Sequence, residues 1–475
     1  MKTVRFQVLS DEELMRIHEA SVWILENIGV RVDSMQAVDI LHGGGAHVDG
    51  KSGVVRFHES MIQDALDSAP STIELYDRRM RKSLVIGHGA GAAAPGHNAV
   101  KFIDHASGAR RPARCTDCAD FARVADALGE YQAIAVPVMP QDVDPKSTIL
   151  HGFFHTSSNS TKHIYFSPDS ARATRSILEM VGAITGKKDF LAGSPVTCQL
   201  SPTSPLVWDR EATDGVIDCA RAGIPLSYLP QPFTGMTAPV TVAGLMAQHN
   251  AELLSGLVLS QLVRPGTPAI YGSAWTTFDM KKANIILCSP EAAALRAAGV
   301  QLASFYGLPS HTIGPDGDAH LYDEQLGWEK LLSTMAAIGA GVDLLVNGGL
   351  FDSAWTVSLE QMVLDAEILS ICRRFMEGIP VDDTTLGLEV IFQVGPGGHF
   401  MEMAHTLEQL RAGALWEAEV SNTYTSKHWE EMGSPSVLVH ASRRVDDLLS
   451  THRPEPLGSD TLRSLHEIIE KFERE

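Results

Sequence analysis

Short apolar runs alternate with longer amphipathic stretches along most of the chain. From about residue 98 the runs are rich in Val, Ile, Leu and Tyr, and apolar residues recur at helical spacing between them. Continuous apolar strands separated by helices predict a parallel sheet that is covered on both faces. The predicted strands span residues 99–103, 134–138, 163–166, 196–200, 225–229, 269–272, 310–313 and 343–346.

Eight such units over roughly 250 residues match the size of a closed (β/α)₈ barrel, or TIM barrel. The alternative is a doubly wound open sheet, but no G-x-G-x-x-G motif follows the first strand to support it. The predicted class is therefore α/β. We expect an N-terminal helical cap over residues 1–80, a barrel catalytic domain over residues 81–450 and a C-terminal helix over residues 451–475.

The two ends of the chain carry helical patterns. Ser10 and Glu13 have the spacing of a capping box, and apolar residues then recur near helical period. Further helices are predicted at residues 35–41, 59–68, 358–376 and 407–419, and a final amphipathic helix at 460–472. The final helix is expected to pack on the barrel or on a second subunit.

Composition narrows the class of protein. Hydrophobic residues make up 44% of the 475 residues and charged residues 20%, which is typical of a globular protein. The net charge of −20 disfavours nucleic acid and anionic membranes as partners. No signal-peptide core or spanning apolar run is visible, and six cysteines are too sparse for a disulfide framework, so a cytoplasmic location is expected.

Cysteine and histidine spacing predicts no metal site. Cys115 and Cys118 form a lone C-x-x-C without a second pair, so we expect neither a structural zinc nor a disulfide there. The pair is expected to open a helix capped by Thr116 or Asp117. His151, His155 and His163 lack H-E-x-x-H spacing and are interpreted as surface or hydrogen-bonded core residues.

Aromatic residues gather in the loops that follow the later strands. Reactive and binding groups of a (β/α)₈ barrel lie at the C-terminal ends of its strands. These loops contain no phosphate-binding glycine motif and no G-x-S-x-G nucleophile. Their rings would suit a quaternary ammonium group, which binds to aromatic faces rather than to hydrogen-bonding groups. Ordinary packing under the loops is the alternative. The rings belong to Phe233, Trp275, Phe278, Phe351 and Trp355.

Three stretches of the chain form distinctive motifs: DEQLGWEK at residues 323–330, SLEQMVLD at 358–365 and GPGGHF at 395–400, followed by His405 and Thr406. They resemble the trimethylamine methyltransferase family, and the likeness covers essentially the whole chain. The resemblance is strongest to members that lack pyrrolysine and act on glycine betaine and related quaternary amines. It implies a (β/α)₈ barrel that binds no cofactor tightly and receives its corrinoid (cobalamin), the methyl acceptor, on a partner protein.

The resemblance also places pyrrolysine of the trimethylamine enzymes near residues 314–316, where this chain has Gly-Pro-Asp. A quaternary amine such as glycine betaine is therefore favoured as methyl donor over trimethylamine. Such a donor already carries its charge and leaves as a neutral amine, so no general acid or zinc is required. Orientation of the reactants could supply roughly 7–11 kcal/mol, and water exclusion would add to it.

We expect Trp275, Phe278, Phe351 and Trp355 to hold the cation, with Phe233 nearby. A substrate carboxylate would take donors from Asn347, His399 or a loop amide, and no catalytic side chain is assigned. The alternatives are the same chemistry on proline betaine, carnitine or a similar compound, transfer to a folate, or a non-catalytic quaternary-amine binding protein. A homo-oligomer is expected.

Overall fold

The protein, a computed structural model that describes residues 5–475, is built around a barrel of parallel strands. The first four residues of the predicted cap lie outside the described residues. The strands hydrogen-bond in the order β6-β18-β17-β14-β13-β11-β10-β9, and a 3.0 Å bond from Gln132 N to Ala93 O links the two ends of this sheet. The predicted (β/α)₈ barrel is confirmed. Its strands are β6 (Ala92–Pro95), β9 (Ala133–Ala135), β10 (His163–Phe166), β11 (Val196–Leu200), β13 (Leu226–Tyr228), β14 (Ala269–Ser273), β17 (Ser310–Gly314) and β18 (Leu344–Gly348).

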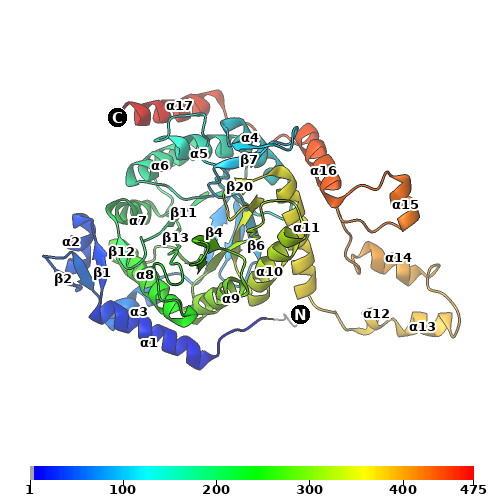
Figure 1. Cartoon of the computed structure of the whole chain (residues 1–475), viewed down its shortest axis with the longest axis horizontal. Helices are drawn as coiled ribbons and strands as arrows, with labels where there is room; N and C mark the ends of the chain where they lie inside the picture. The colour runs from blue at the N-terminus through cyan, green and yellow to red at the C-terminus, as the bar shows by residue number, and fades with distance from the viewer. Residues whose placement is uncertain (1–4) are drawn as a thin grey trace.

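One long helix follows each barrel strand, and together these helices form a ring around the strands (Figure 1). In chain order they are α4 (Cys115–Ala127), α5 (Thr148–Asn159), α6 (Ala171–Thr185), α7 (Arg210–Ala222), α8 (Val242–Val263), α9 (Pro290–Phe305), α10 (Glu324–Ala340) and α11 (Leu359–Met376). The main hydrophobic core lies between the strands and this ring.

The first barrel strand is not the predicted one. Residues 101–103 form β7 (Lys101–Ile103), which belongs to a separate small sheet with β8 (Arg110–Pro112), β19 (Leu350–Phe351) and β20 (Thr356–Val357). The true strand, β6, reads Ala-Ala-Ala-Pro, and alanine is a weak strand former. Small side chains are needed there because Ala92 and Ala94 pack inside the barrel against Tyr165. The other seven predicted strands coincide with barrel strands.

The N-terminal segment packs on one side of the barrel and on the end where the barrel strands begin. Helices α1 and α3 contact α8, and β1 pairs in parallel with β12 (Val207–Trp208). A hairpin of β4 and β5 brings Ile73, Leu75 and Ile86 against Ile270 at the N-terminal ends of the strands. The elements are α1 (Asp11–Asn27), β1 (Val30–Val32), α2 (Met35–Gly43), β2 (His47–Asp49), β3 (Val54–Arg56), α3 (Glu59–Ser68), β4 (Ile73–Tyr76) and β5 (Lys82–Ile86). The segment predicted as a helical cap therefore also contains short strands.

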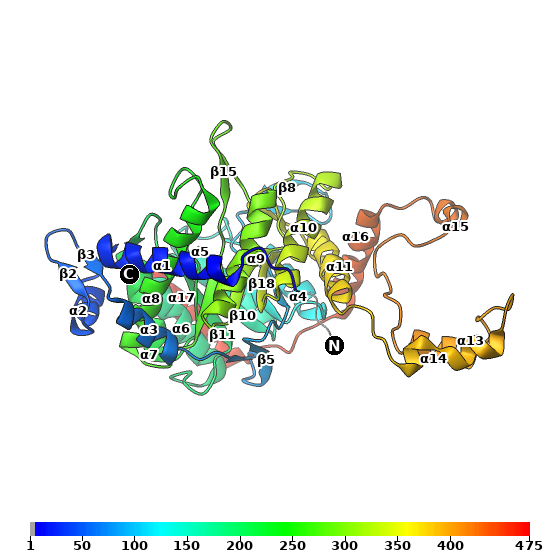
Figure 2. The ribbon, with the colours of Figure 1, turned by 90° about the horizontal axis from the view of Figure 1, so that it is seen from below.

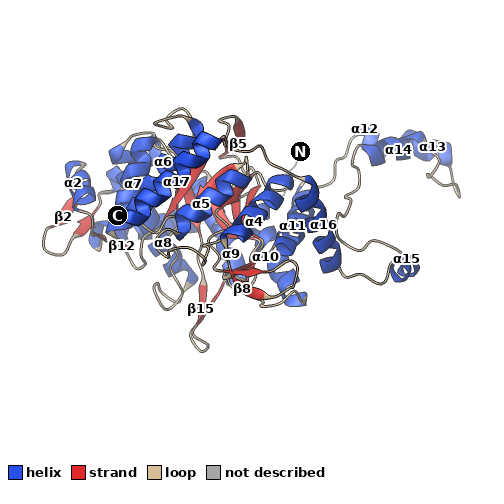
Figure 3. Ribbon diagram, turned by 90° about the horizontal axis from the view of Figure 1, so that it is seen from above, coloured by secondary structure: helices blue, strands red, loops and turns tan. Residues whose placement is uncertain are grey.

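At the opposite end, the hairpin of β15 (Thr277–Asp279) and β16 (Asn284–Ile286) projects beyond the barrel, on the same side as β8 (Figure 3). A bridge between Phe233 and Thr276 ties it to the loop after β13. These loops mark the C-terminal mouth of the barrel.

The C-terminal part leaves the barrel and returns to it. Between α11 and α16 the chain forms an arm, residues 377–436, whose helices project far from the barrel (Figure 2). Midway along it, Trp416 and Val420 return to α11, where Val420 is buried. Helix α16 (Val437–Thr451) then packs on α11 and α4, and α17 (Ser459–Arg474) packs on α5 and α6. The helix predicted at 460–472 is confirmed, whereas the helix predicted at 407–419 ends at Arg411. The arm contains α12 (Asp383–Leu386), α13 (Leu388–Val394), α14 (Ala404–Arg411) and α15 (Ser426–Glu431).

Within residues 5–475, every helix is either too short or too polar to span a bilayer.

Candidate active site at the C-terminal mouth of the barrel

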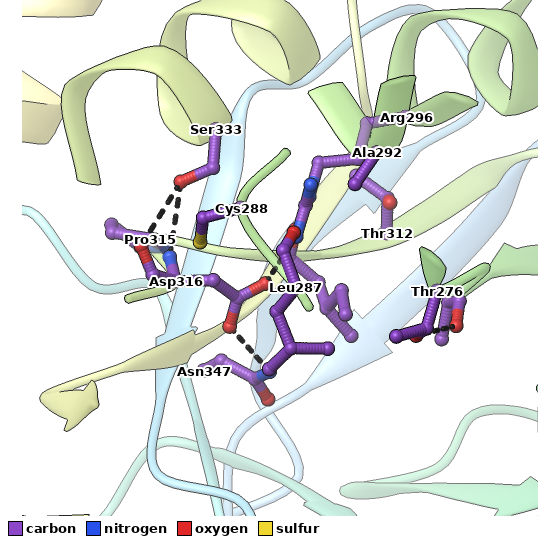
Figure 4. Close-up of polar contacts among 12 residues, drawn as sticks. Thr276, Leu287, Cys288, Ala292, Arg296, Thr312, Pro315, Asp316, Ser333 and Asn347 are labelled. Carbon is purple, nitrogen blue, oxygen red and sulfur yellow. Dashed lines mark hydrogen bonds and ion pairs between the residues drawn. The ribbon is translucent and has the colours of Figure 1, made fainter. Parts of the chain in front are cut away.

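Four polar side chains form one hydrogen-bonded chain across the mouth. His97 Nδ1 lies 3.2 Å from Asn347 Oδ1, and Asn347 Nδ2 donates to Asp316 Oδ1 at 2.9 Å. The other carboxylate oxygen of Asp316 accepts from Arg296 Nη2 at 2.7 Å. Figure 4 shows Asp316 between Asn347 and Arg296. The chain joins the ends of β6, β18 and β17 to helix α9.

Local structure sets the direction of each member. His97 and Asp316 stand two residues beyond the ends of β6 and β17, and Asn347 is the fourth residue of β18. Asn347 has φ +116°, a region in which a residue with a side chain is strained. Strain of this kind concentrates at functional sites, where surrounding contacts hold it in place.

Arg296 is a buried cation with spare hydrogen-bonding capacity. Its guanidinium is 2% exposed and also donates to the carbonyls of Ile313 and Leu287. Its Nη1 atom is buried and has no partner in the described part of the chain. A buried donor without a partner is costly, so Nη1 is suited to a ligand oxygen.

A second polar group lies inside the barrel. The Tyr165 hydroxyl donates to Gln199 Oε1 at 2.8 Å, and His311 Nδ1 lies 3.1 Å from that hydroxyl and 3.0 Å from the Ser227 hydroxyl. The ring of His97 meets the Tyr165 ring edge-on, with centroids 5.9 Å apart. His311 Nε2 is buried and finds no partner among residues 5–475.

The interior histidines carry no charge near neutral pH. Burial lowers the pKa of His311 to about 3, with a smaller contribution from His97. Burial also lowers the pKa of His97, which its hydrogen bond to Asn347 partly opposes. The barrel interior therefore offers neutral imidazoles and an aromatic ring to a ligand, and no histidine cation would repel a positive group.

A pocket of about 140 Å³ opens beside this group. Gln199 and Ser167, at the ends of β11 and β10, line it together with the carboxyl-bearing side chains of Asp169, Asp209 and Glu211. Two of these carboxylates are engaged with helix N-termini: Asp209 caps α7, and Glu211 accepts from Ala171 N at 2.8 Å. The pocket thus has an acidic outer rim and a polar inner wall.

A fully buried ion pair anchors the loops that carry Asp316 and Asn347. Lys330 Nζ lies 2.7 Å from Asp365 Oδ2, and both side chains are 0% exposed. Lys330 also donates to the carbonyls of Pro315 and Leu350, while Asp365 accepts from Gly349 N at 2.6 Å. Helices α10 and α11 therefore hold the loops after β17 and β18 through one shared pair.

The structure does not assemble the predicted aromatic cage. Trp275 points outward from the barrel: it is 3% exposed and its ring lies 4.4 Å from that of His249 on α8. Strand alternation explains this, because Trp275 shares the face of Tyr271 and Ser273 rather than the inward face of Ile270. Trp275 therefore belongs to the layer between strands and helices, and its expected place in the mouth is wrong.

The other predicted rings also lie apart from one another. Phe351, on β19 of the small sheet, is buried among Ile103, Ala319 and Leu326, and Trp355 is 55% exposed. Phe278 and Phe233 are half-buried on the projecting hairpin and the loop beside it. In the described part of the chain, no two of the five predicted rings contact each other.

Only one of the two residues predicted to bind a substrate carboxylate lies in the mouth. Asn347 lies in the mouth and bonds to His97 and Asp316. His399 is exposed on the arm, between α13 and α14, so it cannot reach the mouth of its own barrel (Figure 1).

Sequence reasoning missed most of the polar mouth. His97 follows the strand that was misplaced, and Arg296 reaches the mouth from a helix rather than from a strand end. Asp316 stood in a loop already singled out, immediately after a predicted strand, so its position could have been read as functional. Tyr165, Gln199 and His311 lie within strands, where period-two alternation was the available signal.

A (β/α)₈ barrel with a polar, partly unsatisfied cluster at the C-terminal ends of its strands is the architecture of a TIM-barrel enzyme. The chain belongs to the trimethylamine methyltransferase (MTTB) family, whose profile matches residues 1–475, and it is a methyltransferase. The resemblance expected from its motifs is thereby confirmed.

Curated relatives and solved structures agree with this assignment. The chain is 32% identical to trimethylamine methyltransferase MttB of Desulfitobacterium hafniense, over 98% of this chain and 94% of that protein. It is 31% identical to a glycine betaine methyltransferase of the same species, over 85% and 84%. The monomethylamine methyltransferase MtmB of Methanosarcina barkeri has a similar fold, with a TM-score of 0.51 at 10% identity over 97% of this chain and 92% of MtmB.

Proposed function

We propose that this methyltransferase takes a methyl group from a quaternary amine such as glycine betaine and passes it to the Co(I) corrinoid of a partner protein. The observation that carries the proposal is Asp316. It belongs to residues 314–316, near which the family resemblance places pyrrolysine in the trimethylamine enzymes, and it is held by Arg296 and Asn347. The glycine betaine relative supports the same class of donor.

The mouth suits a donor whose nitrogen is already charged. A quaternary ammonium leaves as a neutral tertiary amine, so the protein need not supply a proton. His97 and His311 are neutral, and the Tyr165 ring between them offers a face to a cation. The acidic rim of Asp169, Asp209 and Glu211 attracts the cation electrostatically.

A betaine carboxylate would be bound by Arg296. Its Nη1 is buried without a partner among the described residues, on the same guanidinium whose Nη2 donates to Asp316. This replaces the expected role of His399, which lies on the arm. Proline betaine and carnitine carry the same two groups and remain alternatives to glycine betaine.

The protein's contribution is orientation and exclusion of water. The bound corrinoid of the partner supplies the nucleophile for the methyl carbon. The loops fixed by Lys330 and Asp365 hold the donor in one direction, which could contribute roughly 7–11 kcal/mol.

The test is methylation of Co(I) cobalamin by the purified protein, followed spectroscopically with a panel of donors. We expect a carboxylate-bearing quaternary amine to be turned over, and tetramethylammonium and trimethylamine to be poor donors. Equal rates with trimethylamine would contradict the quaternary-amine assignment. Saturable betaine binding without methylcobalamin would favour a non-catalytic binding protein.

We also propose that the protein forms a homo-oligomer through its arm. Large apolar side chains of the arm are almost fully exposed, including Ile379 (90%), Phe392 (89%) and Met401 (86%). A monomer rarely exposes such a series, and a symmetric oligomer could cover it. Light scattering should give an assembly larger than one chain, and Phe392→Ser should shift it toward the monomer. A monomeric wild-type protein would contradict this.

A further inference from the structure

We propose a structural zinc site on the outside of the barrel, formed by Cys115, His151 and His155 with Asp142 as the fourth ligand. The potential ligand atoms of the cysteine and the two histidines all lie within 4.8 Å of one another, and all three residues are half-buried. The site lies where the first residue of α4 meets the face of α5 that carries His151 and His155.

The fold brings these residues together from separate elements. Cys115 is the first residue of α4, which Arg114 rather than the predicted Thr116 or Asp117 precedes as N-cap. His151 and His155 are one turn apart on α5, so both side chains lie on one face of that helix. Helices α4 and α5 pack against each other along the barrel. This explains why sequence spacing gave no metal motif.

The geometry is close to that of a tetrahedral site. Zinc–sulfur and zinc–nitrogen bonds of about 2.3 and 2.0 Å place ligand atoms about 3.3–3.6 Å apart. Closing from within 4.8 Å requires only side-chain rotation, because all three side chains are partly free at the surface. Cys118 is not a ligand: its sulfur lies 3.3 Å from Gly152 O and from the Thr156 hydroxyl, inside the core.

Two carboxylates supply negative charge to the site. Asp142 Oδ1 accepts from the backbone N of Cys115 at 3.0 Å, which leaves Oδ2 available for a metal. Glu473, on α17, lies 3.1 Å from His151 Nε2 and accepts from the Ser147 hydroxyl at 2.7 Å. A metal-bound histidine usually donates the N–H of its other ring nitrogen to a carboxylate, which orients the ring. Both charges offset the positive ends of the α4 and α5 dipoles.

The ligand chemistry selects zinc or a similar borderline cation. One thiolate, two imidazoles and one carboxylate are the ligand types of zinc rather than of calcium or magnesium. Binding forms a zinc–sulfur bond and releases the proton of the Cys115 thiol to solvent.

The consequence would be structural. His151 is tied to Glu473 near the end of the chain, and the ring of Phe154 on the same helix contacts that of His466 of α17 at a tilt of 47°, with centroids 4.6 Å apart. A zinc ion at this point would fasten α4 and α5 and hold the C-terminal helix against them (Figure 1).

The experiment uses the full chain and does not depend on activity. Metal-free protein is mixed with one equivalent of Zn²⁺, passed through a desalting column and analysed for bound zinc, with thermal melting alongside. Cobalt(II) is then substituted to look for the sulfur-to-cobalt charge-transfer band. Wild-type protein should retain one zinc per chain, melt at a higher temperature with zinc and show the band.

Cys115→Ser and His155→Gln should each lose the bound zinc and the zinc-dependent rise in melting temperature. Cys288→Ser, which alters the other half-buried thiol, is the matched control and should retain both. Wild-type protein that retains no zinc would overturn the proposal. So would a Cys115→Ser variant that binds zinc as well as the control, or a cobalt spectrum without a thiolate band.

Discussion

Replacing Lys330 by Met should destabilise the protein strongly, because it leaves Asp365 as a buried carboxylate without its cation. Lys330 and Asp365 are both 0% exposed and 2.7 Å apart. Breaking a buried pair by removing one partner typically costs about 3–5 kcal/mol. The carbonyls of Pro315 and Leu350 lose a donor in the same step, so the mouth loops also lose their anchor.

The chain contains a matched control at the surface. Lys82 Nζ and Glu74 Oε1 are also 2.7 Å apart, but their side chains are 52% and 48% exposed. Lys82→Met should therefore cost only about 0–1 kcal/mol. Urea denaturation followed by tryptophan fluorescence gives both free energies of unfolding, and methyl-transfer rates measured well below the melting temperature report on the loops.

The pH dependence of the Lys330→Met effect adds a second test. Burial already raises the pKa of Asp365, although Lys330 opposes the shift. Without Lys330 the folded-state pKa rises further, so the folded variant binds a proton that the unfolded chain releases at neutral pH. The destabilisation should therefore be smaller at pH 5.5 than at pH 8. Equal costs for Lys330→Met and Lys82→Met, independent of pH, would refute the reasoning.

Four further substitutions test packing, the pH dependence of stability and function. Trp275→Leu should lower the free energy of unfolding by about 3 kcal/mol and leave donor affinity unchanged. Trp355→Leu should change neither stability nor donor affinity. Melting curves and donor titration test both, and weaker donor binding by Trp275→Leu would support the aromatic cage. His163 has both ring nitrogens hydrogen-bonded, and burial lowers its pKa to about 4, so the unfolded chain binds more protons below pH 6.5. The free energy of unfolding should therefore fall by about 1.3 kcal/mol from pH 7.5 to pH 5.5 through this residue alone, and His163→Gln should lack that share; an unchanged slope would contradict it. Asn347→Ala removes the link between His97 and Asp316, so kcat/KM should fall at least about tenfold, the equivalent of one hydrogen bond to a charged group. The melting temperature should also fall, because Asn347 is buried, but the variant should stay folded at the assay temperature; full activity would exclude Asn347 from the site.

The fold was largely predictable because periodicity reports burial. Strands such as β14 and β17 are apolar runs of strand length, and the alternation of strands with helices left few arrangements open. The misplaced first strand shows the limit. Two of its three alanines, Ala92 and Ala94, pack in the narrow barrel interior, and the small size of these residues removes the signal that propensity scales detect.

The position of the candidate site could be predicted from the sequence, but the residues that form it could not. The loops after the later strands do form the mouth, yet which face a side chain takes depends on strand register, as Trp275 shows. Arg296 and His399 show a second reason: a helix or an arm can bring a residue to a site, or remove it, over distances that local sequence does not encode. The stretches at 323–330 and 358–365 that resemble the family contain Lys330 and Asp365, the ion pair that anchors the loops of the mouth.

The most direct test of the central claim is the balance between the two products of methyl transfer. Wild-type protein is incubated anaerobically with glycine betaine and Co(I) cobalamin, and methylcobalamin and dimethylglycine are quantified in the same samples over time. The account predicts that both appear in equal amounts and that the same incubation with trimethylamine yields little methylcobalamin or dimethylamine. Methylcobalamin formed from trimethylamine but not from any quaternary amine would contradict it.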